Sequence, residues 1–332
     1  AAHTYGVGSG ASHLVIGHHA LHHQLEETLA ELVGKPRALL FSSGYAANLG
    51  VITALMNRHD VLLQDKWNHA SLLDAGQLSA ATFQRYAHND VSALQARLVS
   101  VSENQQCLVA TDAVFSMDGD IAPLAGMAVL CKSHNAWLMV DDAHGFGVLG
   151  DNGQGTPHHL GCAEGIPVYM ATLGKALGVG GAFVAGDNAL IEFLIQKART
   201  YIYTTALPPA MAAACLASLH VMTSESWRRT HLNALIRRFR LGAQRLGLAL
   251  APSTTAIQPL ILGADAVAVH ASERLWEQGF LVSAIRPPTV PEGTARLRVT
   301  LSAAHTEKDI DDLLDALSRL PKVDEIGIGN TP

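Results

Sequence analysis

Short apolar runs alternate with helical patterns between about residues 37 and 210. Each run has the length of a strand and is too short for a typical helix. Strands that alternate with helices form a mostly parallel sheet with helices on both faces. The candidate strands are residues 38–41, 61–64, 82–86, 106–111, 137–141, 168–172 and 181–185, and the candidate helices between them are 45–57, 70–78, 90–99 and 124–134. We therefore predict an α/β large domain with a seven-stranded, mostly parallel sheet.

A smaller C-terminal α/β domain is expected after this alternation. An Ala-rich helix at 211–222 ends the large domain, so we predict domains at residues 1–222 and 223–332. Strand patterns follow at 257–262, 280–284 and 295–301. A last helix is expected to begin at Thr306, with Asp309 in the position of a capping box.

Composition limits the partners and the compartment. The 332 residues suffice for about two domains, and the net charge of −6 argues against nucleic acid as the main partner. No apolar stretch reaches the ~20 residues that span a bilayer. The four cysteines show no C-x-x-C spacing, so we expect reduced core residues in a cytoplasmic protein.

Lys175 follows the candidate strand at 168–172 and stands in a glycine-rich segment, residues 174–181. We expect an apolar wall behind its ammonium group and close backbone around it. Burial of that kind lowers the pKa of a lysine, as formation of an imine requires. A solvated lysine in an ordinary turn is the alternative, so the interpretation depends on the residues that accompany Lys175.

Two histidines and a carboxylate accompany Lys175. Asp141 ends the strand at 137–141, His144 follows three residues later, and His69 follows another candidate strand. A pyridoxal 5'-phosphate (PLP) site needs a lysine for the aldehyde, a carboxylate for the pyridine nitrogen and a partner for the phenolic oxygen. Asp141 and His144 can fill the last two roles, while His69 can lie over the ring. Asp142 is an alternative to Asp141.

A phosphate site is also expected. Residues 42–48 lead from a strand into a helix, whose first N–H groups can bind phosphate. Thr172 adds a hydroxyl at the same edge of the sheet. Ligands of open α/β sheets bind at the carboxyl ends of the strands, where all these residues lie. The sequence therefore predicts a PLP site.

At this point the chain resembles the α-oxoamine synthase family of fold-type-I PLP enzymes over essentially its whole length. The matching stretches are FSSGYAAN (41–48), NHASL (68–72), VFSMDGD (114–120), VDDAHG (140–145), TLGK (172–175), IYTTALPP (202–209), AIRPPTVP (284–291) and GTARLR (293–298). The resemblance implies a large PLP-binding domain and a small C-terminal domain.

The resemblance also implies a role for each matching residue. Lys175 carries the cofactor and moves protons at the substrate α-carbon, while Asp141 binds the pyridinium. His144 bonds the phenolic oxygen, and His69 stacks on the ring and approaches the substrate. Further cofactor contacts are implied for Gly44, Tyr45, Ser116 and Thr172.

Members of the family are homodimers with shared active sites, which implies that Thr204 or Thr205 reaches the phosphate of the neighbouring subunit. On the substrate side, Arg298 is implied to bind the amino-acid carboxylate, with Arg286 and Thr289 nearby. Alternation of polar and apolar residues at 295–301 supports Arg298, whose guanidinium fork suits a carboxylate. For Arg296, a surface salt bridge is expected.

The implied activity is a decarboxylative condensation of an amino acid with an acyl thioester. The tail most resembles the branch of biotin biosynthesis that joins L-alanine to pimeloyl-CoA or a pimeloyl carrier protein. Glycine with acetyl-CoA, as in glycine C-acetyltransferase, is the alternative. Family members carry an N-terminal arm, with an arginine implicated in acyl-CoA binding, ahead of the stretch YGVGSG (5–10). This sequence begins at Ala1 without that arm, so either the chain is truncated or the arm lies outside this sequence, and competence for acyl-CoA depends on which of the two holds.

Two other classes of protein are weaker alternatives. The stretch HHALHH (18–23) pairs histidines at i, i+4, which can bind zinc, but the His-Glu-x-x-His motif of metal hydrolases is missing. We expect a polar helix face there and no metal. The stretch GVGSGA (6–11) mimics a dinucleotide fingerprint but follows no strand.

Overall fold

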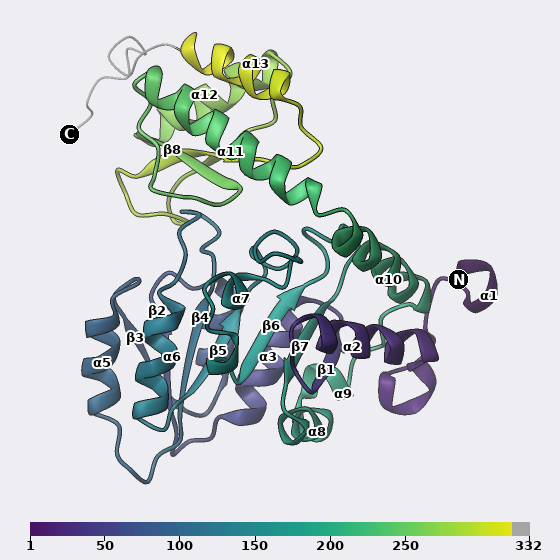
Figure 1. Ribbon diagram of the computed structural model, residues 1–332. Coiled ribbons are helices and arrows are strands. Elements are labelled where there is room, and N and C mark those ends of the chain that lie inside the picture. Colours follow the sequence, from purple (N-terminus) through teal and green to yellow (C-terminus); the bar gives the residue numbers. More distant parts are fainter. Residues whose placement is uncertain (321–332) are drawn as a thin grey trace. The chain divides into compact units, whose positions relative to one another are not determined.

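The computed structural model describes residues 1–320, which form two compact units (Figure 1). The first unit contains residues 1–115 and 122–226, and the second contains residues 116–121 and those from 227 onward. The domain boundary expected at residue 222 stays a prediction; helix α10 (Pro209–Ser224) runs through that position. The end of the predicted small domain, residues 321–332, lies outside the described residues.

A seven-stranded sheet with the order β1-β7-β6-β5-β4-β2-β3 forms the centre of the first unit. Its strands are β1 (Arg37–Phe41), β2 (Val61–Asp65), β3 (Thr82–Tyr86), β4 (Cys107–Asp112), β5 (Trp137–Asp141), β6 (Val168–Thr172) and β7 (Ala182–Gly186). Strands β3, β2, β4, β5 and β6 pair in parallel, and β7 is antiparallel to both of its neighbours. The predicted mostly parallel sheet is confirmed, and each predicted strand lies within one residue of the observed bounds.

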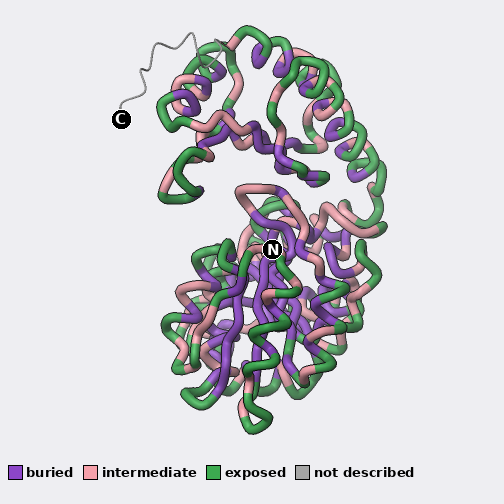
Figure 2. Tube along the Cα trace, turned by 90° about the vertical axis from the view of Figure 1, so that its left-hand side faces the viewer, coloured by how far each residue is buried: buried purple, intermediate pink, exposed green. Residues whose placement is uncertain are grey.

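Neighbouring residues of the central strands pack into different cores on the two faces of the sheet. Val109 and Val140 belong to one core, whereas Leu108 and Met139 belong to the other, and all four are fully buried. Burying one such side chain contributes roughly 1.5–3 kcal/mol, which explains why these strands are apolar on both faces. Buried segments accordingly run through the sheet, whereas the edge strand β3 is buried only at Tyr86 (Figure 2).

Helices cover both faces of this sheet (Figure 1). The first core includes residues of α2 (Ala20–Leu32), α5 (Val91–Val99), α6 (Leu124–Ser133) and α10. The second includes residues of α3 (Gly44–Leu55), α4 (Ala70–Leu78), α8 (Asn188–Lys197) and α9 (Arg199–Ile202). Short turns complete the unit: α1 (Ala2–Tyr5), the π-helical η1 (His13–Gly17), α7 (Thr156–His159) and the 3₁₀ turn η2 (Ala163–Gly165).

Up to residue 320, the second unit packs three helices with a three-stranded antiparallel sheet of order β8-β10-β9. Its elements are α11 (Trp227–Arg245), β8 (Ile257–Gly263), α12 (Asp265–Glu277), β9 (Ser283–Ile285), β10 (Ala295–Thr300) and α13 (Glu307–Ser318). The predicted capping box is present: the Thr306 hydroxyl accepts from the N–H of Asp309, whose carboxylate accepts from the N–H of Thr306.

The strand predicted at 280–284 is partly wrong, because β9 begins only at Ser283. Residues before it finish the preceding helix: the N–H of Phe280 donates to the carbonyl of Leu275, and Gly279 adopts a φ of 88°. A glycine with positive φ followed by such a bond is a helix-ending motif, which uses the residues that the apolar pattern assigned to a strand.

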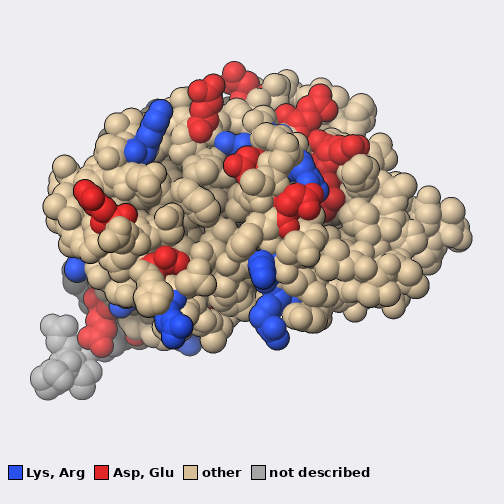
Figure 3. All heavy atoms as spheres, turned by 90° about the horizontal axis from the view of Figure 1, so that it is seen from below, with Lys and Arg blue, Asp and Glu red and all other residues tan. Residues whose placement is uncertain are grey.

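Within residues 1–320, no helix combines the length and the apolar character needed to cross a bilayer. On the face shown in Figure 3, Lys and Arg side chains are scattered among Asp and Glu side chains and form no continuous basic surface. That distribution agrees with the net charge of −6.

Candidate active site

Strands β2, β4, β5 and β6 run in parallel, so their carboxyl ends lie at one edge of the sheet. The last residues of β4, β5 and β6 are Asp112, Asp141 and Thr172. Asp112 pairs in register with Asp141, which brings two buried carboxyl groups to neighbouring strand ends. This edge is where the sequence places the cofactor.

Asp141 is buried and has hydrogen-bond donors of two kinds. The side-chain amide of Asn48 donates to one carboxylate oxygen at 2.7 Å, and the N–H of Ala143 donates to the other at 3.0 Å. Burial raises the pKa of Asp141, whereas the bonds from Asn48 and Ala143 and the charge of Lys175 act in the opposite direction. A buried carboxylate in this position is suited to a cationic partner.

Asp142, the alternative to Asp141, is part of a different network. Its carboxylate accepts from the N–H and hydroxyl of Thr156 at 2.7 and 2.5 Å and from the hydroxyl of Tyr169 at 2.9 Å. Adjacent residues at a strand end point to opposite faces, and Tyr169 belongs to the core on the face away from Asn48. The donors of Asp142 thus belong to the core on that face, whereas Asp141 faces Asn48 at the edge where the cofactor is expected.

Lys175 lies in the turn after β6, where its Nζ is 3.0 Å from Nε2 of His144. The structure thus brings together the lysine and the histidine that the sequence assigned to PLP. However, the side chain of Lys175 is exposed, so the expected dry enclosure is wrong. The turn is at the open edge of the sheet, and the strand core that was expected to enclose the lysine ends before it.

His69 is the N-cap of α4 and is held at this edge by two contacts. Its backbone N–H donates to the carboxylate of Asp112 at 2.7 Å, and its ring Nδ1 lies 2.8 Å from the hydroxyl of Ser71. Burial, followed by the charge of Asp141, raises the pKa of Asp112 well above its ordinary value. The exposed ring of His69 is thereby fixed beside the site.

The start of helix α3 lies close to β6. A Cβ added at Gly44 would come within 2.7 Å of Cγ2 of Thr172, so the close approach of helix and strand requires glycine. Ser43 caps the helix by accepting from the N–H of Ala46 at 3.1 Å, and the hydroxyl of Tyr45 donates to Asp74 at 2.7 Å. Unpaired N–H groups of the first turn can bind an anion.

Two predicted cofactor contacts lie elsewhere in the chain. Thr204 is half-buried and Thr205 exposed in the segment after α9, where Thr205 forms an isolated antiparallel bridge with Ser12. Ser116 is part of the loop 116–121 that belongs to the second unit. The cofactor contacts of Ser116, Thr204 and Thr205 therefore stay predictions.

The predicted substrate residues belong to the second unit. The Nε of Arg298 donates to the carbonyl of Ser116 at 2.5 Å, and its terminal nitrogen donates to the hydroxyl of Thr300 at 3.1 Å. Burial lowers the pKa of Arg298. Arg286 and Thr289 are exposed in the turn after β9.

Arg296 is not a surface residue, contrary to the expectation. Its side chain is 4% exposed and forms an ion pair with Asp118. Its Nε also donates to the carbonyl of Thr294 at 3.0 Å. The salt bridge was expected, but it lies inside the second unit because the loop 116–121 covers β10 there.

Three residues of the site were missed by the sequence analysis: Asn48, Ser71 and Asp112. Asn48 donates to both Asp141 and Ser71, at 2.7 and 2.8 Å, and therefore connects the carboxylate to the residue that positions His69. The sequence did contain a signal for two of them: Asn48 is a polar residue inside a largely apolar helix, and Asp112 ends a mostly apolar strand. Such residues are buried only when they have a partner.

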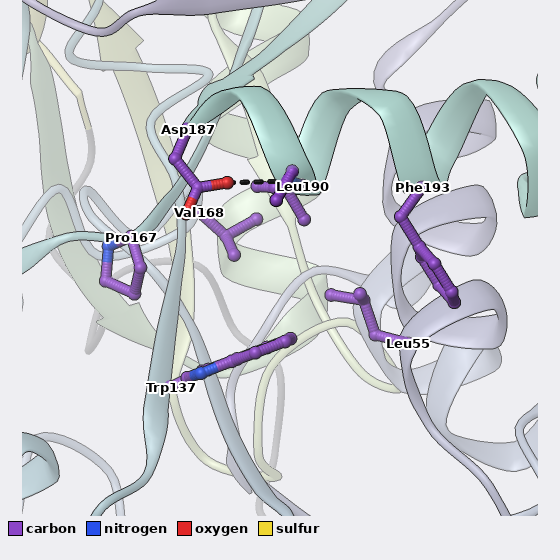
Figure 4. A pocket seen from close by; sticks show the side chains of 8 residues that line it. Leu55, Trp137, Pro167, Val168, Asp187, Leu190 and Phe193 are labelled. Atoms are coloured by element: carbon purple, nitrogen blue, oxygen red, sulfur yellow. Dashed lines mark hydrogen bonds between the residues drawn. The ribbon is translucent and has the colours of Figure 1, made fainter.

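A separate pocket of about 320 Å³ lies at the opposite edge of the sheet (Figure 4). It is lined by Trp137 and Val168, the first residues of β5 and β6, and by Leu55, Leu190 and Phe193 from helices. Its lining is mostly apolar, and none of the residues discussed above faces it. The pocket is thus separate from the residues that the sequence assigned to the cofactor.

Comparison with known proteins identifies the family. Residues 4–317 match the family described as aminotransferase class I and II. The chain is 59% identical to 8-amino-7-oxononanoate synthase of Saccharophagus degradans, over 96% of this chain and 81% of that protein. The corresponding protein of Methylococcus capsulatus is 60% identical over 95% of this chain and 81% of its own length. The chain belongs to the 8-amino-7-oxononanoate synthase family.

Solved structures agree with this assignment. The 8-amino-7-oxononanoate synthase of Francisella tularensis has a TM-score of 0.82 at 33% identity and covers 96% of this chain and 89% of its own. Serine palmitoyltransferase of Sphingomonas wittichii has a TM-score of 0.93 at 33% identity; the match covers 96% of this chain and 80% of that one. A serine palmitoyltransferase of S. paucimobilis, at 31% identity and a TM-score of 0.92, contains a bound aldimine of PLP with myriocin.

Like other members of the 8-amino-7-oxononanoate synthase family, the chain is a PLP-dependent enzyme with the fold-type-I architecture. Its own residues fit the cofactor. The carboxylate of Asp141 is buried and suits a cationic ring nitrogen. In addition, two buried atoms near it, Oδ1 of Asn48 and Oγ1 of Thr172, have no hydrogen-bond partner. Buried polar atoms are normally paired, so partners from a ligand would satisfy both.

Proposed function

We propose that the chain condenses L-alanine with pimeloyl-CoA, or a pimeloyl carrier-protein thioester, giving 8-amino-7-oxononanoate, CO2 and the free thiol. The relatives at 59–60% identity that are 8-amino-7-oxononanoate synthases support this choice of substrates. The observation that carries the proposal is the meeting of Lys175, His144 and the buried Asp141 at one sheet edge.

PLP, when bound, supplies an electron sink for the electron pair left at the α-carbon of the amino acid. Lys175 would hold the cofactor aldehyde until the amine of the amino acid takes its place. The freed Nζ would then remove the proton from that α-carbon and return one after CO2 is lost. Asp141 would remain ionised and keep a proton on the ring nitrogen. The hydrogen bonds from Asn48 and Ala143 favour this ionised form, against the effect of burial, which raises the pKa of Asp141.

The remaining contacts would orient the cofactor. His144, within 3.0 Å of Lys175 Nζ, would bond the phenolic oxygen, and His69 would cover the ring on the substrate side. The N–H groups of Gly44 and Tyr45 at the start of α3 would bind the phosphate, with the hydroxyl of Thr172 as a further contact. The exposed position of His69 supports contact with substrate.

For the second unit, we propose that Arg298 binds the carboxylate of alanine and that Arg286 and Thr289 lie on the substrate side. Ser116 would contact the cofactor from the same unit. The half-buried guanidinium of Arg298 supports this role, since a partly desolvated cation gains more from a carboxylate than an exposed one does.

We also propose a cytoplasmic homodimer with shared active sites, in which Thr204 or Thr205 reaches the phosphate of the neighbouring subunit. The exposed apolar side chains of Leu14, Val15 and Ile16 support an interface, because they are 50–76% exposed in this single chain. The four cysteines are free thiols, in agreement with a reducing compartment.

The first test is an absorption spectrum of the PLP-loaded protein with and without L-alanine, repeated on Lys175→Ala. We expect the lysine-linked chromophore in the unmodified chain and its loss in the variant; a variant that keeps it overturns the role of Lys175. Turnover of alanine with pimeloyl-CoA is then compared with that of glycine with acetyl-CoA. Preference for the second pair would overturn the proposed substrates.

A further inference from the structure

Five histidines surround the start of helix α2, and the proposed active site uses none of them. They are His13, His18, His19, His22 and His23. Neighbouring ring centroids in this group lie 5.1 to 6.4 Å apart. Imidazole clusters of this density are common in transition-metal sites, although a polar helix face can also carry them. The hydrogen bonds distinguish the two cases.

Two of the five rings have other partners. His22 is fully buried; its Nδ1 accepts from the N–H of His19 at 2.9 Å, and its Nε2 lies 2.5 Å from the carbonyl of Leu207. Both ring nitrogens of His22 are thus used: Nδ1 caps the start of α2, and Nε2 joins α2 to the segment after α9. The ring of His19 packs edge-on against Tyr5, with centroids 5.6 Å apart.

His18 and His23 form a possible ligand group together with Glu26. One donor atom from each of the three residues lies within 4.8 Å of the others, and Nε2 of His18 is 3.9 Å from Oε2 of Glu26. In a tetrahedral site with bonds of about 2.1 Å, ligand atoms are separated by about 3.4 Å. Small side-chain rotations would therefore bring the three atoms onto one ion.

The positions of two of these ligand atoms are already set by outer contacts. Nδ1 of His18 is 2.8 Å from Nδ1 of His13, and a hydrogen bond there directs Nε2 of His18 toward Glu26. The N–H of Leu40 donates to Oε1 of Glu26 at 2.9 Å, which leaves Oε2 facing His18. Outer contacts of this kind orient histidine and carboxylate ligands in metal sites.

His23 has a competing partner in Glu27, whose carboxylate lies 3.2 Å from its Nε2. Both side chains are 68% exposed. An exposed pair of this kind contributes little, about 0–1 kcal/mol, and can be displaced by a metal ion. The pair therefore does not exclude His23 as a ligand.

We propose that His18, His23 and Glu26 bind one divalent transition-metal ion of the zinc type. Two imidazoles and a carboxylate suit zinc, cobalt or nickel, whereas magnesium and calcium prefer oxygen ligands alone. His18 directly follows η1, and the other two ligands lie on α2, so the ion links the π-helical turn to the helix. Its role is structural, with water at the fourth position.

The experiment uses PLP-loaded protein that carries no polyhistidine tag and has been freed of metal with a chelator. Zn²⁺ is titrated calorimetrically, and Co²⁺ is titrated while its visible ligand-field bands are recorded. The variants are His23→Gln and Glu26→Gln, with His59→Gln as the control, because His59 is an exposed histidine on the turn before β2. Glu27→Gln removes the competing carboxylate.

We expect one ion per chain in the unmodified protein, the His59→Gln control and Glu27→Gln. Affinity should fall by at least about tenfold in His23→Gln and Glu26→Gln, since each loses a ligand. Zn²⁺ should also raise the thermal midpoint of the unmodified protein and of the control but not that of His23→Gln. Equal affinity and equal midpoint shifts in the unmodified protein and His23→Gln would overturn the proposal, as would the lack of any binding.

Discussion

The side-chain amide of Asn48 donates a 2.7 Å hydrogen bond to the buried carboxylate of Asp141, 93 residues away in the sequence. Asn48 lies on α3, the helix whose first turn is proposed to bind the cofactor phosphate. One helix therefore connects the two ends of the proposed PLP site. Because Asn48 also donates to Ser71, the carboxylate and the residue beside His69 are held by the same amide.

Replacing Asn48 with alanine should weaken PLP binding. The change removes a donor to a buried carboxylate, which costs roughly 1–3 kcal/mol and corresponds to about a 5–150-fold weaker affinity. PLP affinity is measured by absorbance titration of the apoprotein. Asn57→Ala is the control, since Asn57 is exposed just beyond the end of α3. Equal affinities for the two variants would contradict the role of Asn48.

Gly44→Ala should weaken PLP binding by a steric effect. The new Cβ would meet Cγ2 of Thr172 at 2.7 Å, so the start of α3 must move away from β6. Thr172→Ser removes that methyl group and keeps the hydroxyl. We therefore expect the double variant to recover most of the lost affinity for PLP, as measured by absorbance titration of the apoprotein with PLP. A double variant no better than Gly44→Ala would show that the contact is not the cause.

Arg298 and Arg296 should respond differently to the same substitution. Arg298→Lys loses the guanidinium fork proposed to bind alanine, so KM for alanine should rise by about tenfold or more with little loss of stability. Arg296→Lys disturbs a buried ion pair with Asp118 and a bond to Thr294, and should lower the free energy of unfolding by about 1–3 kcal/mol. Steady-state kinetics and urea unfolding measure the two effects. If Arg298→Lys changes stability and leaves KM unaltered, its assignment to the substrate is wrong.

The pH dependence of stability should contain a contribution from Asp142. Burial raises the pKa of its carboxyl group to about 7 in the folded chain, against an ordinary value of 3.8. Between these values the folded chain holds a proton that the unfolded chain has released. This contribution to stability is therefore complete below about pH 4 and is lost as the pH rises through about 7.

Asp142→Asn removes that contribution and nearly preserves the shape of the side chain. We expect the difference in free energy of unfolding between the two proteins to change by up to about 1.4 kcal/mol per pH unit. Urea unfolding at about pH 5, 6 and 7 measures it. Taking the difference cancels the contributions of the other titrating groups. Parallel stability profiles would mean that Asp142 does not carry a shifted pKa.

Local sequence patterns were sufficient for the elements of the sheet. The strands at 82–86, 137–141 and 168–172 have the predicted bounds, because strand length and apolar character are properties of a few consecutive residues. Their parallel direction followed from the helices between them, and that direction alone placed Asp141 and Thr172 at one edge. Lys175 and His144 were predicted to lie at that edge for the same reason, since each follows the carboxyl end of a parallel strand.

Tertiary structure decided which atoms meet at that edge. Asp141 and Asp142 are equivalent in a linear reading, and they differ only because one faces Asn48 and the other faces Thr156 and Tyr169. Lys175 has the apolar sequence neighbours expected of a buried residue, yet it is exposed because the sheet ends before its turn. Sequence patterns state which side chains must leave water, whereas hydrogen-bond partners and exposure depend on chain segments that become neighbours only when the helices pack on the sheet.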